Sequence, residues 1–313
     1  MLDELGLHLV RLDLPFRLNH VNCFLAEGEE GYVVIDTGLH NSYTVRRWAE
    51  ELDRKHVSEI FITHYHPDHF GYAGGLQQKT NARLSMSQID AENGLGAWDR
   101  QFLEKLAGNY QVAGIPAEAA SQMVDNTESF IKRVTPYPTV NHYFNEGELV
   151  KIGNYMYEVL FTPGHSDGLI VFYNKEKSVL LSTDHILPKI TPNISYWFHG
   201  DPNPLATYFQ SLNKIRKLDV EYVIPSHGLP FFGGTKRIDE IKQHHHDRLE
   251  NLLEELSAGL TVFEACKKLF PKINNVHDFR FAIGETLAHL EYLRYNDECK
   301  RDVVGGNYVY YTE

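Results

Sequence analysis

The chain has 313 residues, of which 42% are hydrophobic and 23% charged. This composition is ordinary for a globular enzyme, and the length allows one large and one small domain. The formal net charge of −12 opposes non-specific attraction to a polyanion, so nucleic acid is a disfavoured partner.

The cysteine content and the hydropathy pattern exclude two further classes of protein. Cys23, Cys266 and Cys299 are odd in number and far apart, which indicates reduced thiols and argues against a disulfide framework or a structural zinc site. No apolar run approaches the roughly 20 residues of a membrane span, and the first residues lack the basic and apolar regions of a signal peptide. We therefore expect a cytoplasmic protein without membrane contact.

The N-terminal part of the chain is predicted to open with β-strands. Short strands at 8–13, 21–26 and 32–36 suit the edge of a β-sandwich. The last of them ends at Asp36, beside a glycine that allows a tight turn. Asp36 either caps the helix predicted at about 41–53 or belongs to a functional site at this strand end.

Residues 63–69 place four metal-binding side chains in one short segment, namely His64, His66, Asp68 and His69. The preceding residues, VSEIFIT, are mostly apolar and β-branched, which predicts a buried strand that delivers His64 at its C-terminal end. Pro67 fixes φ and lacks an N–H group, so we expect the histidines to lie on a bent loop.

On such a loop His64 and His66 can face one metal ion, while Asp68 and His69 turn toward a second point nearby. Imidazole and carboxylate donors suit zinc, and iron and manganese are also compatible with them. The chain contains 17 histidines, so a single histidine would carry little information. The H-x-H-x-D-H spacing at a strand end nevertheless predicts a metal site.

This stretch resembles the signature of the metallo-β-lactamase-fold hydrolases. The resemblance implies an α/β fold, a four-layer αββα sandwich, with further ligands at later strand ends: a third histidine, a bridging aspartate and a final histidine. It also implies that Asp36 is a carboxylate that orients the metal-binding loop.

Residues from about 85 to 134 are predicted to form a helical insertion after the histidine cluster. In this fold the insertion would lie over the mouth of the site, either as a substrate lid or as a cap that serves only stability. Trp98, Phe102, Tyr110 and Met123 either line an apolar pocket or form the small core of the insertion itself.

The next strands supply two of the missing ligands. Strand patterns at 143–153 and 155–163 lead to a Gly-His pair in a turn, where the resemblance predicts His165 as the third ligand of the first metal. The following strands end at Asp184 after an apolar run, and a carboxylate there is costly unless it is paired or metal-bound. Asp184 is therefore the predicted bridging ligand. His185 points the opposite way on an extended chain and is predicted to be a structural or pocket residue.

The segment 186–204 is rich in proline and is predicted to be a long surface loop near the site. Tyr196, Trp197 and His199 are candidates for the pocket wall, although simple packing explains them equally well. A helix at 205–218 and a strand at 220–225 then deliver His227, which completes the predicted set. The first metal would be held by His64, His66 and His165, the second by Asp68, His69 and His227, and both by Asp184.

From residue 235 the composition changes, and we divide the chain into a hydrolase domain at 1–234 and a C-terminal domain at 235–313. Three amphipathic helices and a hairpin that turns at Gly305 and Gly306 resemble the winged-helix module of the subgroup that includes β-lactamase-like protein 2. His244, His245 and His246 lie on the first of these helices, and one of them is within possible reach of the groups that support the ligands.

A winged helix often binds DNA, but the third helix here is charge-balanced and carries no basic stripe. Its charged and polar residues include Arg280, Glu285, His289, Glu291 and Arg294. We therefore expect the module to serve packing, formation of a homodimer or closure of the pocket.

The predicted ligand set determines the expected chemistry. Two cations that share Asp184 would lie roughly 3.5–4 Å apart and would ionise a bridging water to hydroxide, the nucleophile. Asp68 and Asp184 are the predicted catalytic carboxylates, because Asp68 can carry the proton toward the leaving group. With Asp68 present, the sequence resembles the glyoxalase II, lactonase, thioesterase and ribonuclease branch of the family. This resemblance disfavours β-lactam hydrolysis.

We predict hydrolysis of a small acyl substrate, a thioester first and a lactone second, because the chain is acidic and the expected lid is apolar and aromatic. Three alternatives stay open. They are a phosphodiesterase or ribonuclease of the same fold, a mononuclear-iron dioxygenase, and a non-catalytic winged-helix regulator that binds DNA.

Overall fold

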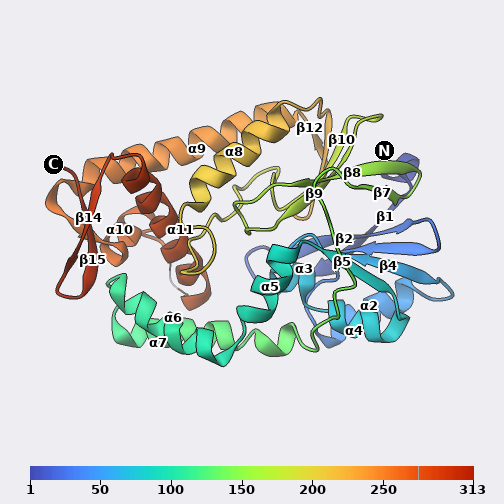
Figure 1. The fold of residues 1–313 in the computed structure, drawn as a ribbon, viewed down its shortest axis with the longest axis horizontal. Coiled ribbons are helices and arrows are strands. Elements are labelled where there is room, and N and C mark those ends of the chain that lie inside the picture. Colours follow the sequence, from blue (N-terminus) through green and yellow to red (C-terminus); the bar gives the residue numbers. More distant parts are fainter. Residues whose placement is uncertain (274) are drawn as a thin grey trace.

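The computed structural model describes residues 1–273 and 275–313. Two six-stranded sheets lie together in the half of the molecule that holds the N-terminus, away from the C-terminal hairpin (Figure 1). The first sheet has the order β1-β2-β3-β4-β5-β6. Its first three strands are antiparallel, whereas β3 to β6 run parallel. The strands of this sheet are β1 (Leu7–Asp13), β2 (His20–Glu27), β3 (Tyr32–Ile35), β4 (Val57–Phe61), β5 (Arg83–Met86) and β6 (His142–Tyr143).

The second sheet has the order β12-β11-β10-β9-β8-β7. Its neighbours are antiparallel except for β10 and β11, which run parallel. The strands of this sheet are β7 (Leu149–Ile152), β8 (Tyr155–Phe161), β9 (Ile170–Asn174), β10 (Val179–Thr183), β11 (Tyr222–Pro225) and β12 (Phe231–Phe232). Both sheets are therefore mixed.

Successive side chains of the central strands point to opposite faces of the sheets, and apolar residues occur on both faces. Both faces are therefore covered. In β2, Phe24 and Ala26 enter the core between the two sheets, whereas Val21, Cys23 and Leu25 face the helices on the outer side. Those helices are α2 (Ser42–Glu51) and α4 (Ala73–Thr80). The short α1 (Leu2–Leu5) precedes β1.

The second sheet shows the same arrangement on its own outer face. Val179 and Leu181 of β10 point into the core between the sheets, and Leu180 packs with α8 (Pro204–Arg216) on the other side. Helices therefore cover both outer faces of the sandwich, which confirms the αββα fold predicted from the resemblance.

A helical region connects β5 to β6, as predicted. It consists of α5 (Gln88–Gly96), α6 (Arg100–Val112), α7 (Ala117–Glu128) and the 3-10 turn η1 (Ile131–Arg133). Helices α6 and α7 pack on each other and against the C-terminal part of the chain. Met123 is fully buried in that shared core, so this part of the insertion is anchored to the C-terminal region.

The C-terminal part has the predicted helices and hairpin. Its elements are α9 (Gly234–Glu255), η2 (Leu256–Ala258), β13 (Leu260–Thr261), α10 (Val262–Leu269), α11 (Val276–Tyr295), β14 (Lys300–Val304) and β15 (Asn307–Tyr311). The short β13 joins the hairpin in a three-stranded antiparallel sheet of order β13-β15-β14. Gly305 and Gly306 have positive φ angles, which glycine adopts without a steric penalty.

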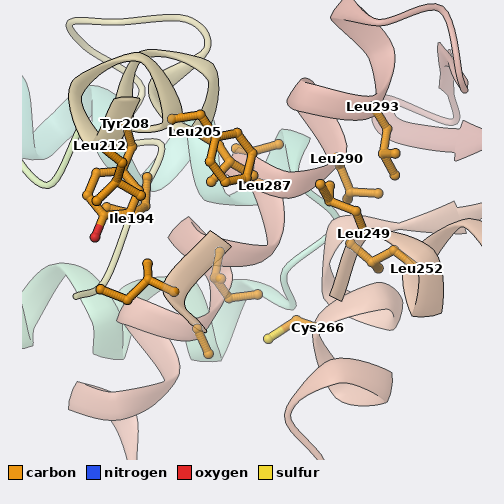
Figure 2. Close-up of a cluster of buried hydrophobic side chains, with 14 of the residues drawn as sticks. Ile194, Leu205, Tyr208, Leu212, Leu249, Leu252, Cys266, Leu287, Leu290 and Leu293 are labelled. Carbon is orange, nitrogen blue, oxygen red and sulfur yellow. The ribbon is translucent and has the colours of Figure 1, made fainter. Parts of the chain in front are cut away.

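Helix α11 is buried along most of its length, because α7, α8, α9 and α10 all contact it. Leu287, Leu290 and Leu293 of α11 pack with Leu249 and Leu252 of α9 (Figure 2). Glu285, His289 and Glu291 are also buried, so these polar residues of the charge-balanced helix do not form an exposed surface.

Two local predictions are also wrong. Pro67 does not bend a loop; it occupies the first turn of a short helix, α3 (Pro67–Phe70), where a proline is favoured because the N–H group it lacks has no partner there anyway. Residues 186–203 form no helix or strand, as predicted, although Pro204 already begins α8. Ile186 and Ile194 are core residues, so the segment 186–204 is not simply a surface loop. Within the described ranges, no helix is long and apolar enough to cross a membrane.

Candidate metal centre

Parallel pairing brings the predicted ligands to one edge of the sandwich. Ile35 of β3 pairs with Phe61 of β4, so Asp36 and the segment leading to His64 leave their strands side by side. In the second sheet, Thr183 of β10 pairs with Pro225 of β11. Asp184 and His227 therefore also emerge together.

The structure gathers all seven predicted ligands into neighbouring groups. His64, His66 and His165 form one group, Asp68, His69 and His227 form another, and Asp184 groups with His64 and His69; within each group the possible ligand atoms lie within 4.8 Å of one another. One carboxylate oxygen of Asp184 lies 3.3 Å from Nε2 of His165, and the other lies 3.3 Å from Nε2 of His227. Asp184 therefore bridges the two triads, which is the position expected of a shared ligand.

Asp36 orients two of the histidines. It accepts a hydrogen bond from Nδ1 of His69 at 2.8 Å and two more from the backbone N–H and the hydroxyl of Thr63. Because the Thr63 hydroxyl donates to Asp36, it is free to accept from Nδ1 of His64, 3.1 Å away. Asp36 thus has the supporting position that the resemblance predicted for it.

Two backbone carbonyls orient further histidines. His165 donates from Nδ1 to the carbonyl oxygen of Asn193 at 2.7 Å, and His227 donates from Nδ1 to that of His20 at 2.6 Å. In all four of these histidines, Nδ1 is the donor, so Nε2 carries a lone pair that is directed away from the support.

The chemistry of this donor set fits divalent cations. Nε2 of His64, His66, His69 and His227 and Oδ1 of Asp184 are buried atoms that have no hydrogen-bond partner among the described residues. Buried polar atoms without partners are costly, and lone pairs that converge without donors between them form a cation site. These clusters are consistent with a metal site of histidine and aspartate ligands.

Neighbouring charges shift the pKa values in this centre in both directions. Burial would lower the pKa of His69, but Asp184 and other nearby carboxylates outweigh it and raise that pKa well above its usual value. Burial, together with the neighbouring His69 and His66, lowers the pKa of His64 well below its usual value, which favours the neutral form that binds metals. Burial alone would raise the pKa of Asp184, but His227 and His69 outweigh it and hold that pKa well below its usual range. Asp184 therefore stays ionised in the protein interior.

The backbone is strained at or next to two of these carboxylates. Asp36 has a φ of 56°, and Thr183, which precedes Asp184, has a φ of 47°. A positive φ is unusual for a β-branched residue such as threonine and costs on the order of 1–3 kcal/mol. Both residues end strands that reach the centre, so packing holds the chain in a turn that directs each carboxylate inward.

Several supporting residues were not predicted from the sequence. Asp90 of α5 accepts hydrogen bonds from the backbone of Tyr65 and of Gly168 and from the hydroxyl of Ser166, so it ties together the segments that carry His66 and His165. Asn22 of β2 donates to the carbonyls of Pro225 and Gly228 on either side of His227. A polar residue inside the apolar strand VNCFLA was the one available signal for Asn22.

A pocket of about 830 Å³ opens onto the centre. His66, Asp68, His165 and Asp184 lie in its wall on the side of the predicted ligands. Of the aromatic candidates, the ones that line it are Trp98, Phe102, Tyr110, Trp197 and His199. Met123 and Tyr196 do not, because both pack in the large core that the second sheet shares with the C-terminal helices.

The C-terminal region closes the far side of this pocket. His277, Arg280 and Phe281 of α11 line it, and the sequence alone did not reveal this contribution. His185 is buried against the ring of Tyr208, as a structural residue would be. His245 does not reach the groups that support the ligands and instead hydrogen-bonds to His289 of α11 at 3.0 Å.

Comparison with known proteins agrees with this geometry. The family model described as "Metallo-beta-lactamase superfamily" matches residues 17–227, and "Metallo-beta-lactamase-like, C-terminal domain" matches residues 249–312. The chain is 24% identical to "Probable metallo-hydrolase YqjP" of Bacillus subtilis, over 96% of each protein. It is 28% identical to "Hydroxyacylglutathione hydrolase GloC" of Haemophilus influenzae, over 55% of this chain and 69% of that protein.

Among solved structures, the metallo-beta-lactamase family protein TTHA1429 from Thermus thermophilus is 30% identical, and the match covers 98% of this chain and 99% of that one with a TM-score of 0.86. The family match spans more than half of the chain, and the solved relative matches nearly all of it. The chain therefore belongs to the metallo-β-lactamase superfamily.

Proposed function

We propose that the protein is a metal-dependent hydrolase of small acyl thioesters, with lactones as the second substrate class. One observation carries the proposal. Buried lone pairs of histidine and aspartate converge, without hydrogen-bond partners among the residues described, at the wall of a pocket large enough for a small organic substrate.

In this proposal His64, His66 and His165 hold one divalent cation, Asp68, His69 and His227 hold a second, and Asp184 contacts both. When bound, such cations supply Lewis acidity and bring the ionisation of water toward neutral pH. Zinc suits these nitrogen and oxygen donors, and iron and manganese are compatible with them.

The protein's own groups then position the substrate and move the proton. Water attacks the carbonyl carbon, a C–O bond forms, and the C–S bond breaks to give a carboxylic acid and a thiol. Asp68 is the most exposed of the three carboxylates discussed here, with 20% of its side chain accessible. In this proposal it accepts the proton of the attacking water and returns it to the departing sulfur.

The pocket wall supports an acyl substrate. Trp98, Phe102 and Tyr110 from the insertion supply apolar and aromatic surface opposite the polar centre, as an acyl chain requires. The name of the relative GloC describes hydrolysis of a thioester, and a human relative, 27% identical over 53% of this chain, is named "Acyl-coenzyme A thioesterase MBLAC2". Both names support the thioester class.

A panel of substrates tests the proposal. Purified protein supplied with zinc, manganese or iron is assayed with a thioester, a lactone and bis-p-nitrophenyl phosphate. We expect turnover of the thioester, a lower rate on the lactone, and loss of both activities on treatment with a chelator. Turnover of the phosphodiester alone would favour the phosphodiesterase alternative instead.

The DNA-binding alternative has less support from the structure. A recognition helix must present its side chains to the major groove, yet α11 is buried by four other helices over residues 282–291. Tight, salt-sensitive binding of duplex DNA in a gel-shift assay, together with no hydrolysis, would reverse this preference.

A further inference from the structure

Arg280 of α11 is a cation in the pocket wall without an anionic partner. Its Nε is buried, and neither an ion pair nor a hydrogen bond involves its side chain within residues 1–273 and 275–313. The guanidinium lies over the rings of Trp197, at 5.2 Å, and Phe281, at 4.6 Å. Aromatic stacking holds its plane in place but leaves its N–H donors without acceptors.

Other arginines of this region show that acidic partners are not scarce. Arg248 also lines the pocket, but it forms an ion pair with Glu285 of α11. Arg294 and Arg301 both pair with Glu291 at 2.6 Å. The chain has a net charge of −12, so an arginine left without a carboxylate at a pocket wall needs a separate reason.

The position of Arg280 relates it to the predicted metal centre. Trp197 contacts both groups: the guanidinium lies over its ring, and the ring of His66 meets it edge-on with a centroid distance of 6.4 Å. Arg280 and His66 therefore line one pocket and share Trp197 as a neighbour.

Leaving this cation unpaired costs stability. A partly buried guanidinium loses hydration and gains no ion pair, and burial accordingly lowers the pKa of Arg280. Binding sites accept such costs when a ligand supplies the missing charge. A planar guanidinium is the side chain that best binds a carboxylate or phosphate through two parallel hydrogen bonds.

We propose that Arg280 forms an anion subsite, so that the preferred thioester carries a carboxylate or other anionic group a short distance from the bond that is hydrolysed. This inference rests on the proposed thioesterase function and names the substrate class within it. The anion is carried either by the acyl group or by the thiol, and both place the same chemistry at Arg280.

Four matched thioesters test the subsite and distinguish the two sources. They share one skeleton, a five-carbon acyl group on 3-mercaptopropionic acid, and carry at each end either a carboxylate or the isosteric carboxamide. We expect one of the two monoanions to exceed the diamide in kcat/KM by about 10- to 100-fold, the range of a charge-assisted hydrogen-bond pair. The preferred monoanion shows which end Arg280 binds.

Variants assign that preference to one residue. Arg280→Gln should remove the preference for the monoanion, Arg280→Lys should keep part of it, and Arg46→Gln, an exposed arginine on α2, should leave it unchanged. Thermal unfolding supplies a second readout, because removing an unpaired cation should leave Tm unchanged or raise it. A fall in Tm with equal losses on all four thioesters would show that Arg280 is purely structural and would overturn the proposal.

The remaining outcomes separate the subsite from the proposed function. If wild-type protein hydrolyses the diamide and the monoanions equally well, the subsite is wrong and the thioesterase function stands. If it hydrolyses none of them, the thioesterase function fails, and calorimetric titration with glutaramate and with glutaramide tests the subsite directly. Tighter glutaramate binding by wild type than by Arg280→Gln supports the subsite, and equal binding overturns it.

Discussion

The molecule contains two buried clusters of histidine and acid that look alike in composition but differ in how their polar atoms are satisfied. One is the centre at the sheet edges; the other consists of His245, Glu285 and His289, between α9 and α11. In both, the possible ligand atoms lie within 4.8 Å of one another. Proximity of such side chains is therefore not enough to identify a metal site.

The difference lies in the charges and donors around each cluster. In the C-terminal cluster His245 hydrogen-bonds to Nε2 of His289, and Nδ1 of His289 donates to the carbonyl of Glu285. Arg248 neutralises the carboxylate of Glu285, which also accepts from Asn193 at 3.0 Å. Internal partners thus satisfy this cluster except for Nε2 of His245, whereas the centre has several buried ligand atoms without hydrogen-bond partners among the described residues.

The largest effect is expected from Asp184→Asn. This change keeps the shape of the side chain but removes the negative charge that the triads share, so it should lower both metal content and turnover. We expect kcat to fall by roughly 10³-fold, as when one electrostatic group of a transition state is removed. Elemental analysis and steady-state kinetics measure the two effects. Unchanged turnover would show that the seven side chains do not form the catalytic centre.

Asp36→Asn should have the next largest effect. Asparagine tolerates the positive φ of this position, but its amide presents a donor to Nδ1 of His69 or to Thr63. His69 then loses the partner that leaves its Nε2 unprotonated. We expect metal affinity to fall by about 10- to 100-fold, as for other residues that orient metal ligands.

Competition with a chromogenic chelator measures that affinity. The matched control is Asp239→Asn, which breaks an exposed pair with Arg216 and should leave metal affinity unchanged. If Asp36→Asn binds metal as tightly as wild type does, Asp36 is only a cap of the following helix, the other role that its sequence position allowed.

The pH dependence of stability tests the C-terminal cluster of the two, through His289. Burial lowers the pKa of His289 to about 3, below the value of about 6.5 in an unfolded chain. Between these values the unfolded state binds more protons, so the free energy of unfolding is highest above pH 6.5 and falls as the pH decreases. Each pH unit in this window should cost about 1.4 kcal/mol.

Urea unfolding with a chelator present, at several pH values from 7 to 4.5, measures this slope. The variant His289→Gln should be less stable at pH 7 but should show a flatter slope than wild type. The exposed His56→Gln variant should keep the wild-type slope. Identical slopes for wild type and His289→Gln would mean that His289 is not held neutral by its surroundings.

The side chains that gather at this centre could be predicted from the sequence because each of them follows an apolar strand or lies in the dense histidine cluster. A histidine that lies next to a glycine after a strand can be recognised from the sequence alone, as at His165 and His227. The tautomers were not predictable, because the carbonyls of His20 and Asn193 that orient these histidines lie far away in the sequence and backbone acceptors have no sequence pattern.

The sequence alone also could not identify which residues line the pocket. For Trp98, Phe102, Tyr110 and Met123 the sequence left a pocket wall and a core equally open, because an apolar side chain serves both. From the sequence, Arg280 was only one charged residue of a charge-balanced helix. Only the packing of α11 among four helices reveals that this arginine faces the pocket.

The smallest effect, and the most direct test of the comparison, is expected from His245→Gln. Glutamine keeps a hydrogen-bonding side chain near His289 and much of the contact with Tyr208 and Phe209, but it cannot replace imidazole as a metal ligand. Because Arg248 already supplies the positive charge beside Glu285, we expect the metal content per chain to stay at the wild-type value. Loss of one equivalent of metal would mean that the arginine does not exclude a cation, and that the two clusters differ less than their hydrogen bonds indicate.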